Sequence, residues 1–402
     1  MSRAVRVLRC AILLPAFACS LAAAQSPSLD GLWLGALDVG GVKLRIALHI
    51  ARDSSGFTGT MDSIDQGASA IAMDTITLAG DAVHFEIHRI GGSYQGTLNA
   101  ARSEIEGKWS QGGATFPLNF ERTDKVPELT RPQNPKKPYP YNEEEVAYEN
   151  KKGGVKLAGT LTWPRAAGPF PAALLITGSG AQDRDEALMG HRPFLVLADH
   201  LTRHGIAVLR VDDRGVGGST GSTPDSTSAD FAGDVLAGID YLKTRKEVNP
   251  AQIGLIGHSE GGLIAPMVAS NSSDVAYIIM MAGPGMRGDE IMLAQAEAIS
   301  KAMGVGPDAV AKNRALQQKI FQVIRSEHDR AAAERKIREA WAESVAQLPE
   351  AEQKTINTPG TLEAQLMLSL SPWFRYFMDY DPLPALRKVK CPVLALDGER
   401  DL

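Results

Sequence analysis

The sequence is poor in cysteine, which limits the cross-links that it can form. Of its three cysteines, Cys10 and Cys19 lie in the N-terminal leader described below, so removal of the leader leaves Cys391 alone. One cysteine cannot form an intramolecular disulfide, and its place before a proline at the start of an apolar run favours a buried side chain over a catalytic thiol. We therefore expect a hydrophobic core to stabilise this 402-residue chain.

Excess positive charge and a membrane-spanning segment are also lacking. The formal net charge is -5, which argues against a nucleic-acid partner. An apolar run between Cys10 and Ala23 is only about 15 residues long, whereas a spanning helix needs about 20. Because the run follows three arginines and ends in three alanines, residues 1–24 are predicted to be a signal peptide of an exported protein, periplasmic or secreted, with no stable membrane span.

Nucleotide-binding motifs are missing as well. The glycine-rich segment 212–219 fails as a dinucleotide fingerprint, because Thr220 stands where the last glycine should be, and no G-x-x-x-x-G-K-S/T occurs. We interpret this segment as a structural loop in which Arg214 ties neighbouring loops together.

Residues 26–123 are predicted to form a small antiparallel β-domain. Apolar residues alternate with polar ones at period two, as in Val42, Leu44, Ile46, Leu48 and Ile50. His84, Glu86 and His88 fall on one face of another predicted strand. Same-face neighbours on a strand are about 7 Å apart, too far for three bonds of about 2 Å to one zinc ion. No metal site is therefore predicted.

The residues after the β-domain change in character. Five prolines in 124–142 predict a semi-rigid linker. From 143 to 402 strands alternate with helices, which predicts an α/β domain with a mostly parallel sheet covered by helices. The strand candidates are 172–177, 206–211, 253–256, 275–281 and 392–396, and the helix candidates are 195–203, 229–245 and 262–270.

A nucleophile motif lies between the third strand candidate and the helix after it. Gly257 and Gly261 flank Ser259 in the pattern G-x-S-x-G. A serine on a sharp strand-to-helix turn needs neighbours without side chains, so that its hydroxyl stands clear and the chain packs closely on both sides. Ser259 is therefore the candidate nucleophile. The backbone N–H of Glu260 and that of Ser179, on a glycine-rich loop after an earlier strand, are the candidate oxyanion hole.

The chain resembles the α/β-hydrolase superfamily, and within it the EstD-like bacterial carboxylesterases, close to the serine aminopeptidase-like hydrolases. The residues that carry the resemblance lie in four segments, 177–185, 213–219, 257–262 and 398–401. The resemblance covers about 146–402. It implies hydrolysis of a small-molecule ester through an acyl-enzyme, with no metal ion or organic cofactor.

The same resemblance assigns a role to the long helical stretch at about 284–381, which would form a cap over the nucleophile. The alternative is a surface helical hairpin without substrate contact. The family pattern also favours Asp401 as the acid of the catalytic triad, with Asp397 as the alternative. The triad histidine should follow the acid, and the chain ends at Leu402, so we expect an incomplete C-terminus and a histidine beyond it.

Three functions from different classes remain open. A carboxylesterase is the first. A serine peptidase of the same fold is the second, since the same triad cleaves amides. The third is a non-catalytic binding protein in which the hydrolase domain has decayed.

Overall fold

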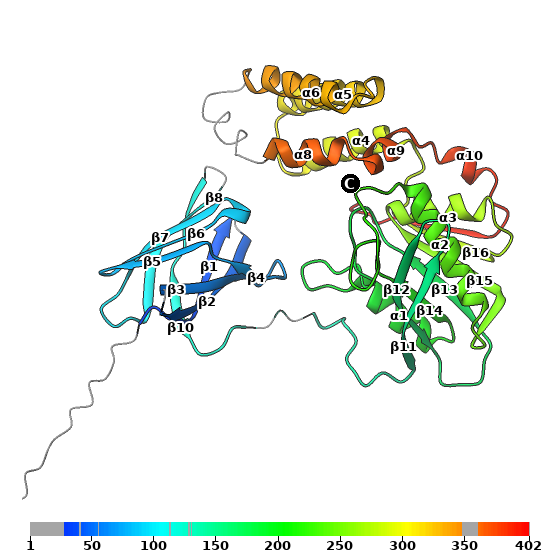
Figure 1. Cartoon of the computed structure of the whole chain (residues 1–402), viewed down its shortest axis with the longest axis horizontal. Coiled ribbons are helices and arrows are strands. Elements are labelled where there is room, and N and C mark those ends of the chain that lie inside the picture. The colour runs from blue at the N-terminus through cyan, green and yellow to red at the C-terminus, as the bar shows by residue number, and fades with distance from the viewer. Residues whose placement is uncertain are drawn as a thin grey trace, which may run out of the picture.

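The computed structural model describes residues 28–401, apart from positions 40, 41, 55, 112, 113, 128, 130 and 348–360. The predicted signal peptide, 1–24, lies outside the described residues. Two sheets organise the chain, one in the N-terminal part and one after it (Figure 1). The first has ten strands and the second has seven.

The first sheet is antiparallel throughout, as predicted. Its order is β4-β3-β2-β1-β10-β8-β7-β6-β5, and β9 pairs with β8. The strands are β1 Gly31–Val39, β2 Val42–Asp53, β3 Gly56–Ser63, β4 Ala68–Ala72, β5 Thr75–Ala79, β6 Ala82–Ile87, β7 Gly92–Leu98, β8 Glu104–Gln111, β9 Ala114–Pro117 and β10 Phe120–Thr123. A 3-10 turn, η1 His88–Ile90, follows β6.

The interior of this sheet is aromatic. Trp33 is fully buried and donates Nε1–H to the Leu29 carbonyl oxygen at 2.8 Å. Phe85 stacks on Tyr94 with ring centroids 4.8 Å apart. Of the apolar residues that alternate in β2, Ile46, Leu48 and Ile50 are buried, whereas Val42 at its start is 60% exposed. The strand extends there beyond the core that would bury it.

The second sheet is mixed, with order β11-β12-β14-β13-β15-β16-β17. Its strands are β11 Asn142–Asn150, β12 Val155–Trp163, β13 Phe170–Ile176, β14 Ala207–Val211, β15 Val248–His258, β16 Tyr277–Met281 and β17 Val393–Leu396. The strands from β14 to β17 pair in parallel, whereas β12 runs antiparallel to both β11 and β14. The expectation of a mostly parallel sheet therefore missed this edge, where a short turn joins β11 to β12 and permits only antiparallel pairing.

Helices cover both faces of the mixed sheet. The three that follow parallel strands are α1 Pro193–Arg203, α2 Ser228–Lys243 and α3 Glu260–Ala269. Buried residues of α2 and α3 pack with Leu174 and Leu255 of the sheet, while α1 packs on the opposite face against Ala173 and Val208. This arrangement leaves the ends of β13 and β15 side by side, which positions the candidate site.

The segment predicted as a cap is helical in the described residues (Figure 1). Its helices are α4 Gly288–Ala302, α5 Pro307–Ser326, α6 Arg330–Val345, α8 Thr361–Ser369 and α9 Pro372–Asp379, and α10 Leu383–Leu386 follows. Buried Phe321, Ile337 and Phe374 form a core of their own between α5, α6 and α9. Of the helices that the structure describes, none is long and apolar enough to cross a membrane.

The proline-rich segment contacts the loop that precedes α1. Arg131 Nη2 donates to the Met189 carbonyl oxygen at 2.7 Å, and Asn134 Nδ2 donates to that of Gly190 at 3.0 Å. Gln133 lies 2.9 Å from His191 Nδ1. The segment therefore packs against the part of the chain that contains the mixed sheet, as well as joining that part to the first sheet.

Candidate active site

The candidate nucleophile lies on a tight turn between β15 and α3. Ser259 has φ 51° and ψ -114°, in the left-handed half of backbone space that side chains rarely adopt. Both flanking glycines are needed for this turn. A Cβ on Gly257 would collide with the Gly261 carbonyl, and a Cβ on Gly261 would collide with the Ile176 carbonyl. The geometry thus gives the physical reason for the G-x-S-x-G pattern.

The candidate oxyanion hole consists of the backbone N–H groups of Ser179 and Glu260. Within the described residues, neither the Ser179 N–H nor the Glu260 N–H donates a hydrogen bond. The Glu260 N–H is at the N-terminus of α3, where the helix leaves its first amides unpaired. Such amides suit a developing negative charge.

The loop that carries Ser179 is held on one side by Asp213. Its carboxylate accepts from Thr177 Oγ1 at 2.7 Å and from the Gln182 N–H at 2.9 Å. Burial, reinforced by the charges of Glu260 and Glu186, raises the pKa of Asp213 to about 7. Sequence reasoning did not find this role, because the segment 212–219 reads as a glycine-rich loop.

The other side of the loop meets Glu186. Glu186 Oε1 accepts from the Gly178 N–H at 2.7 Å and lies 2.8 Å from His258 Nδ1. Hydrogen bonding to Glu186 raises the pKa of His258, and the charges of Glu186 and Asp401 add to the rise. Glu186 thus connects His258 to the loop after β13 that carries Gly178 and Ser179. Sequence reasoning missed Glu186, whose only signal in the sequence is that it directly follows 182–185, a segment that carries the family resemblance.

The side chain of Glu260 links the nucleophile turn to the helical segment above it. Its carboxylate is 2% exposed and accepts from Ser228 Oγ at 2.5 Å and from Trp373 Nε1 at 2.9 Å. Burial raises the pKa of Glu260. Because Trp373 belongs to α9, this contact joins the predicted cap to the residue that follows Ser259.

The candidate acid lies in an exposed turn just after β17. The Asp401 N–H donates to the Gly398 carbonyl oxygen at 3.0 Å, and Asp401 is close enough to His258 for its charge to raise the pKa of that imidazole. The alternative acid, Asp397, directly follows β17. Among the described residues no histidine nitrogen hydrogen-bonds to Ser259 Oγ.

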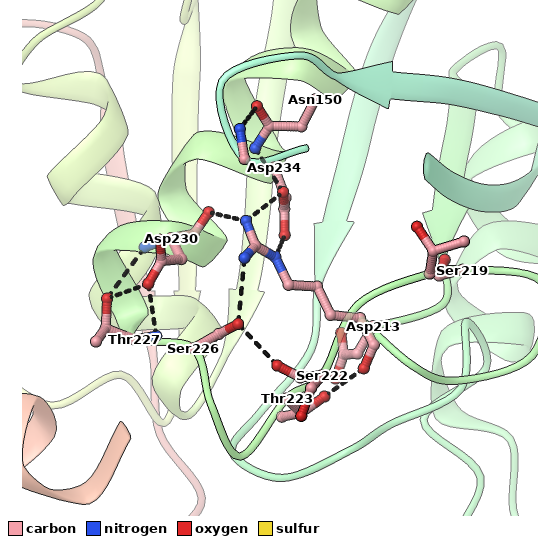
Figure 2. Close-up of polar contacts among 12 residues, drawn as sticks. Asn150, Asp213, Ser219, Ser222, Thr223, Ser226, Thr227, Asp230 and Asp234 are labelled. Carbon is pink, nitrogen blue, oxygen red and sulfur yellow. Dashed lines mark hydrogen bonds and ion pairs between the residues drawn. The ribbon is translucent and has the colours of Figure 1, made fainter. Parts of the chain in front are cut away.

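Arg214 connects loops, as the sequence suggested. Figure 2 shows the hydrogen-bond network in which Asn150, Ser226 and Asp234 take part. The Arg214 guanidinium forms a two-point contact with Asp234 of α2, at 2.6 and 3.0 Å, and donates to Ser226 Oγ at 3.1 Å. Asn150 Nδ2 binds the same carboxylate at 2.7 Å. Arg214 therefore ties the loop next to Asp213 to helix α2.

The histidines considered for zinc bind a carboxylate instead. His84 Nε2 lies 3.2 Å from Glu86 Oε1, and His88 Nε2 lies 3.0 Å from Glu86 Oε2. In the part of the chain that the structure describes, no group of three or more His, Cys, Asp or Glu side chains is arranged to hold a metal ion.

Comparison with known proteins gives one matching family model and several similar proteins. The family model described as serine aminopeptidase, S33, matches residues 192–355, which include Ser259 and Glu260. Esterase EstD of Thermotoga maritima is 31% identical over 188 residues, which are 46% of this chain and 45% of that protein. The predicted resemblance is confirmed.

Two further proteins extend the comparison. YtaP of Bacillus subtilis, which carries the name of a hydrolase, is 32% identical over 114 residues, 24% of this chain and 38% of that protein. The chain thus spans less than half the length of either curated relative. Among solved structures, an esterase of Pyrococcus furiosus is 20% identical, with a TM-score of 0.37 and coverage of 63% of this chain and 69% of that chain.

Proposed function

We propose that this chain is a serine hydrolase that cleaves carboxylic esters of small molecules, with Ser259 as its nucleophile. The observation that carries the proposal is the strained conformation of Ser259 at a strand-to-helix turn, next to the Glu260 N–H, which donates no hydrogen bond within the described residues. Strain of this kind costs on the order of 1–3 kcal/mol and persists where function requires it. A relative with the name esterase supports the choice of ester substrates.

In the proposed reaction Ser259 Oγ attacks the ester carbonyl carbon while its proton passes to a base. The N–H groups of Ser179 and Glu260 stabilise the oxygen that becomes negative. The carbonyl forms again as the alcohol leaves, and water then hydrolyses the acyl-enzyme by the same steps. Asp401 is the proposed acid that orients the base. The scheme uses no metal ion or organic cofactor.

The helices α4 to α9 are the proposed cap over this site. The contact between Trp373 of α9 and the carboxylate of Glu260 supports the assignment, because it joins the helical segment to the nucleophile turn. We propose that this cap shapes the pocket for the acyl or alcohol group of the substrate.

A serine peptidase is the second candidate, because the matching family model is named after a serine aminopeptidase. The two candidates share the nucleophile and differ in the bond that is cleaved. Turnover of 4-nitrophenyl esters and of aminoacyl 4-nitroanilides separates them. We expect ester turnover to be faster, and a preference for the anilide would favour the peptidase.

Burst kinetics test the nucleophile. With a 4-nitrophenyl ester, the protein expressed from its complete gene should release a burst of nitrophenol equal to the enzyme concentration, because acylation precedes slower deacylation. Ser259→Ala should abolish the burst and leave the fold intact. The control is Ser270→Ala, the same substitution at the other end of α3, where the hydroxyl donates to the Met267 carbonyl oxygen at 3.0 Å and accepts from Asn271 Nδ2 at 3.1 Å. A burst that survives in Ser259→Ala places the nucleophile elsewhere.

A further inference from the structure

We propose that Glu186 is a positioning residue, which fixes the oxyanion loop against the nucleophile turn. The inference rests on the proposed function, since it concerns the distance between Ser259 and the N–H of Ser179. Glu186 itself touches neither the substrate nor the hydroxyl of Ser259 in this scheme.

One oxygen of Glu186 joins two parts of the chain that are far apart in sequence. Oε1 accepts from the Gly178 N–H at 2.7 Å, on the loop after β13, and lies 2.8 Å from Nδ1 of His258, the residue before Ser259. Since a carboxylate only accepts, Nδ1 is the donor of the second bond. Hydrogen bonds to an ionised carboxylate are shorter and stronger than those between neutral groups.

The backbone and burial of Glu186 are unusual for a glutamate. It is 8% exposed and has φ 51°, a conformation that side chains other than Asn and Asp rarely adopt. A buried carboxylate is unfavourable unless it is well hydrogen-bonded. A local structure with both features is consistent with a functional constraint on this position.

The bonded groups lie next to the reacting serine. A Cβ placed on Gly178 would be 3.2 Å from Glu186 Oε1, 3.2 Å from His258 Nδ1 and 3.4 Å from Ser259 Cβ. The Gly178 backbone therefore packs directly against the nucleophile. Because Ser179 is the next residue, any shift of Gly178 moves the proposed oxyanion donor.

The shape of the loop does not depend on Glu186 alone. Asp213 accepts from Thr177 Oγ1 and from the Gln182 N–H, at the two ends of the same loop. Loss of Glu186 should therefore leave the loop folded while its distance from Ser259 becomes variable. The expected effect is on the transition state, in which the oxyanion forms, and much less on substrate binding.

The test uses the protein expressed from its complete gene, with 4-nitrophenyl acetate as substrate and a fluorophosphonate as probe. Labelling of Ser259 in the unmodified protein, mapped by mass spectrometry, first establishes the proposed nucleophile. Glu186→Ala should then lower kcat and the labelling rate about 100-fold, with KM within about threefold. Glu186→Gln, which keeps an acceptor oxygen, should recover kcat to within about tenfold of the unmodified protein. The control is Asp199→Ala, at a position away from the site. This substitution removes a carboxylate that accepts a hydrogen bond from the Tyr141 hydroxyl at 3.0 Å.

The outcomes are separable. Absence of labelling at Ser259 contradicts the proposed function, whatever Glu186 does. Labelling at Ser259 together with a kcat for Glu186→Ala close to that of the unmodified protein overturns the positioning role. Glu186→Asp keeps the charge and tolerates the positive φ but withdraws the oxygen by one methylene, so it serves if Glu186→Ala fails to fold. Its kcat should fall at least tenfold, and an unchanged kcat also overturns the inference.

Discussion

Asp213 should make the stability of this protein depend on pH. Burial raises its pKa from 3.8 to about 7, so the folded state holds a proton at pH values where the unfolded chain has lost it. The folded state therefore binds more protons between about pH 4 and pH 7, and the free energy of unfolding falls as pH rises through this range. Asp213→Asn replaces the group with one that does not titrate.

The magnitude follows from the two pKa values. Between pH 5 and pH 8, the contribution of Asp213 to the free energy of unfolding should decrease by about 2.5 kcal/mol. The pKa values of Glu260 and His258 are also raised, so these groups change stability in the same direction. They remain in the variant, and the difference between the two proteins isolates Asp213.

Urea denaturation at pH 5, 6, 7 and 8 measures this difference. Asp213→Asn should lose less stability than the unmodified protein as pH rises, by about 2.5 kcal/mol over the range. Asp225→Asn, at an exposed carboxylate that binds Ser222 Oγ at 2.8 Å, controls for the loss of an acid. Parallel pH dependence of Asp213→Asn and the unmodified protein would refute the argument that burial of Asp213 is unfavourable for its charged form.

Two further predictions concern the surroundings of the site. Trp373→Phe removes the N–H that binds the Glu260 carboxylate. KM for 4-nitrophenyl butyrate should therefore rise severalfold, with a smaller change in kcat. An unchanged KM would contradict the proposed role of α4 to α9 as a cap. A chain that begins at Lys125 lacks the first sheet and should keep ester turnover. A chain that begins at Pro140 should have at least tenfold lower ester turnover, because it also lacks the contacts of Arg131 and Asn134 with the loop 188–191. Equal turnover by two folded truncations, as judged by circular dichroism, refutes a supporting role for the linker.

Local patterns in the sequence predicted much of the fold correctly. The period-two alternation predicted the antiparallel sheet, and the apolar strands around Leu174 and Leu255 predicted the centre of the second sheet. The sequence predicted the nucleophile turn because its glycines are required locally. A Cβ on Gly257 or on Gly261 would collide with backbone atoms.

The features that were missed depend on contacts between distant segments. Apolar runs do not predict the hairpin of β11 and β12, because β12 has polar residues such as Thr160 in buried positions. The role of Glu186 depends on contacts with Gly178 and His258, 8 and 72 residues away, and no local pattern encodes them. The contact of the linker with the loop 188–191 also joins distant segments. The proline content of the linker predicts its stiffness, but not the surface against which it packs.

In the proposed reaction Ser259 carries the acyl group. The most direct measurement is peptide mapping by mass spectrometry after the protein, expressed from its complete gene, is quenched with acid during turnover of a slowly deacylating 4-nitrophenyl ester. We expect one acyl group per chain, on the peptide that contains Ser259, and none in Ser259→Ala. An acyl group on another residue, or turnover of the ester without any acylated peptide, would contradict the proposed reaction.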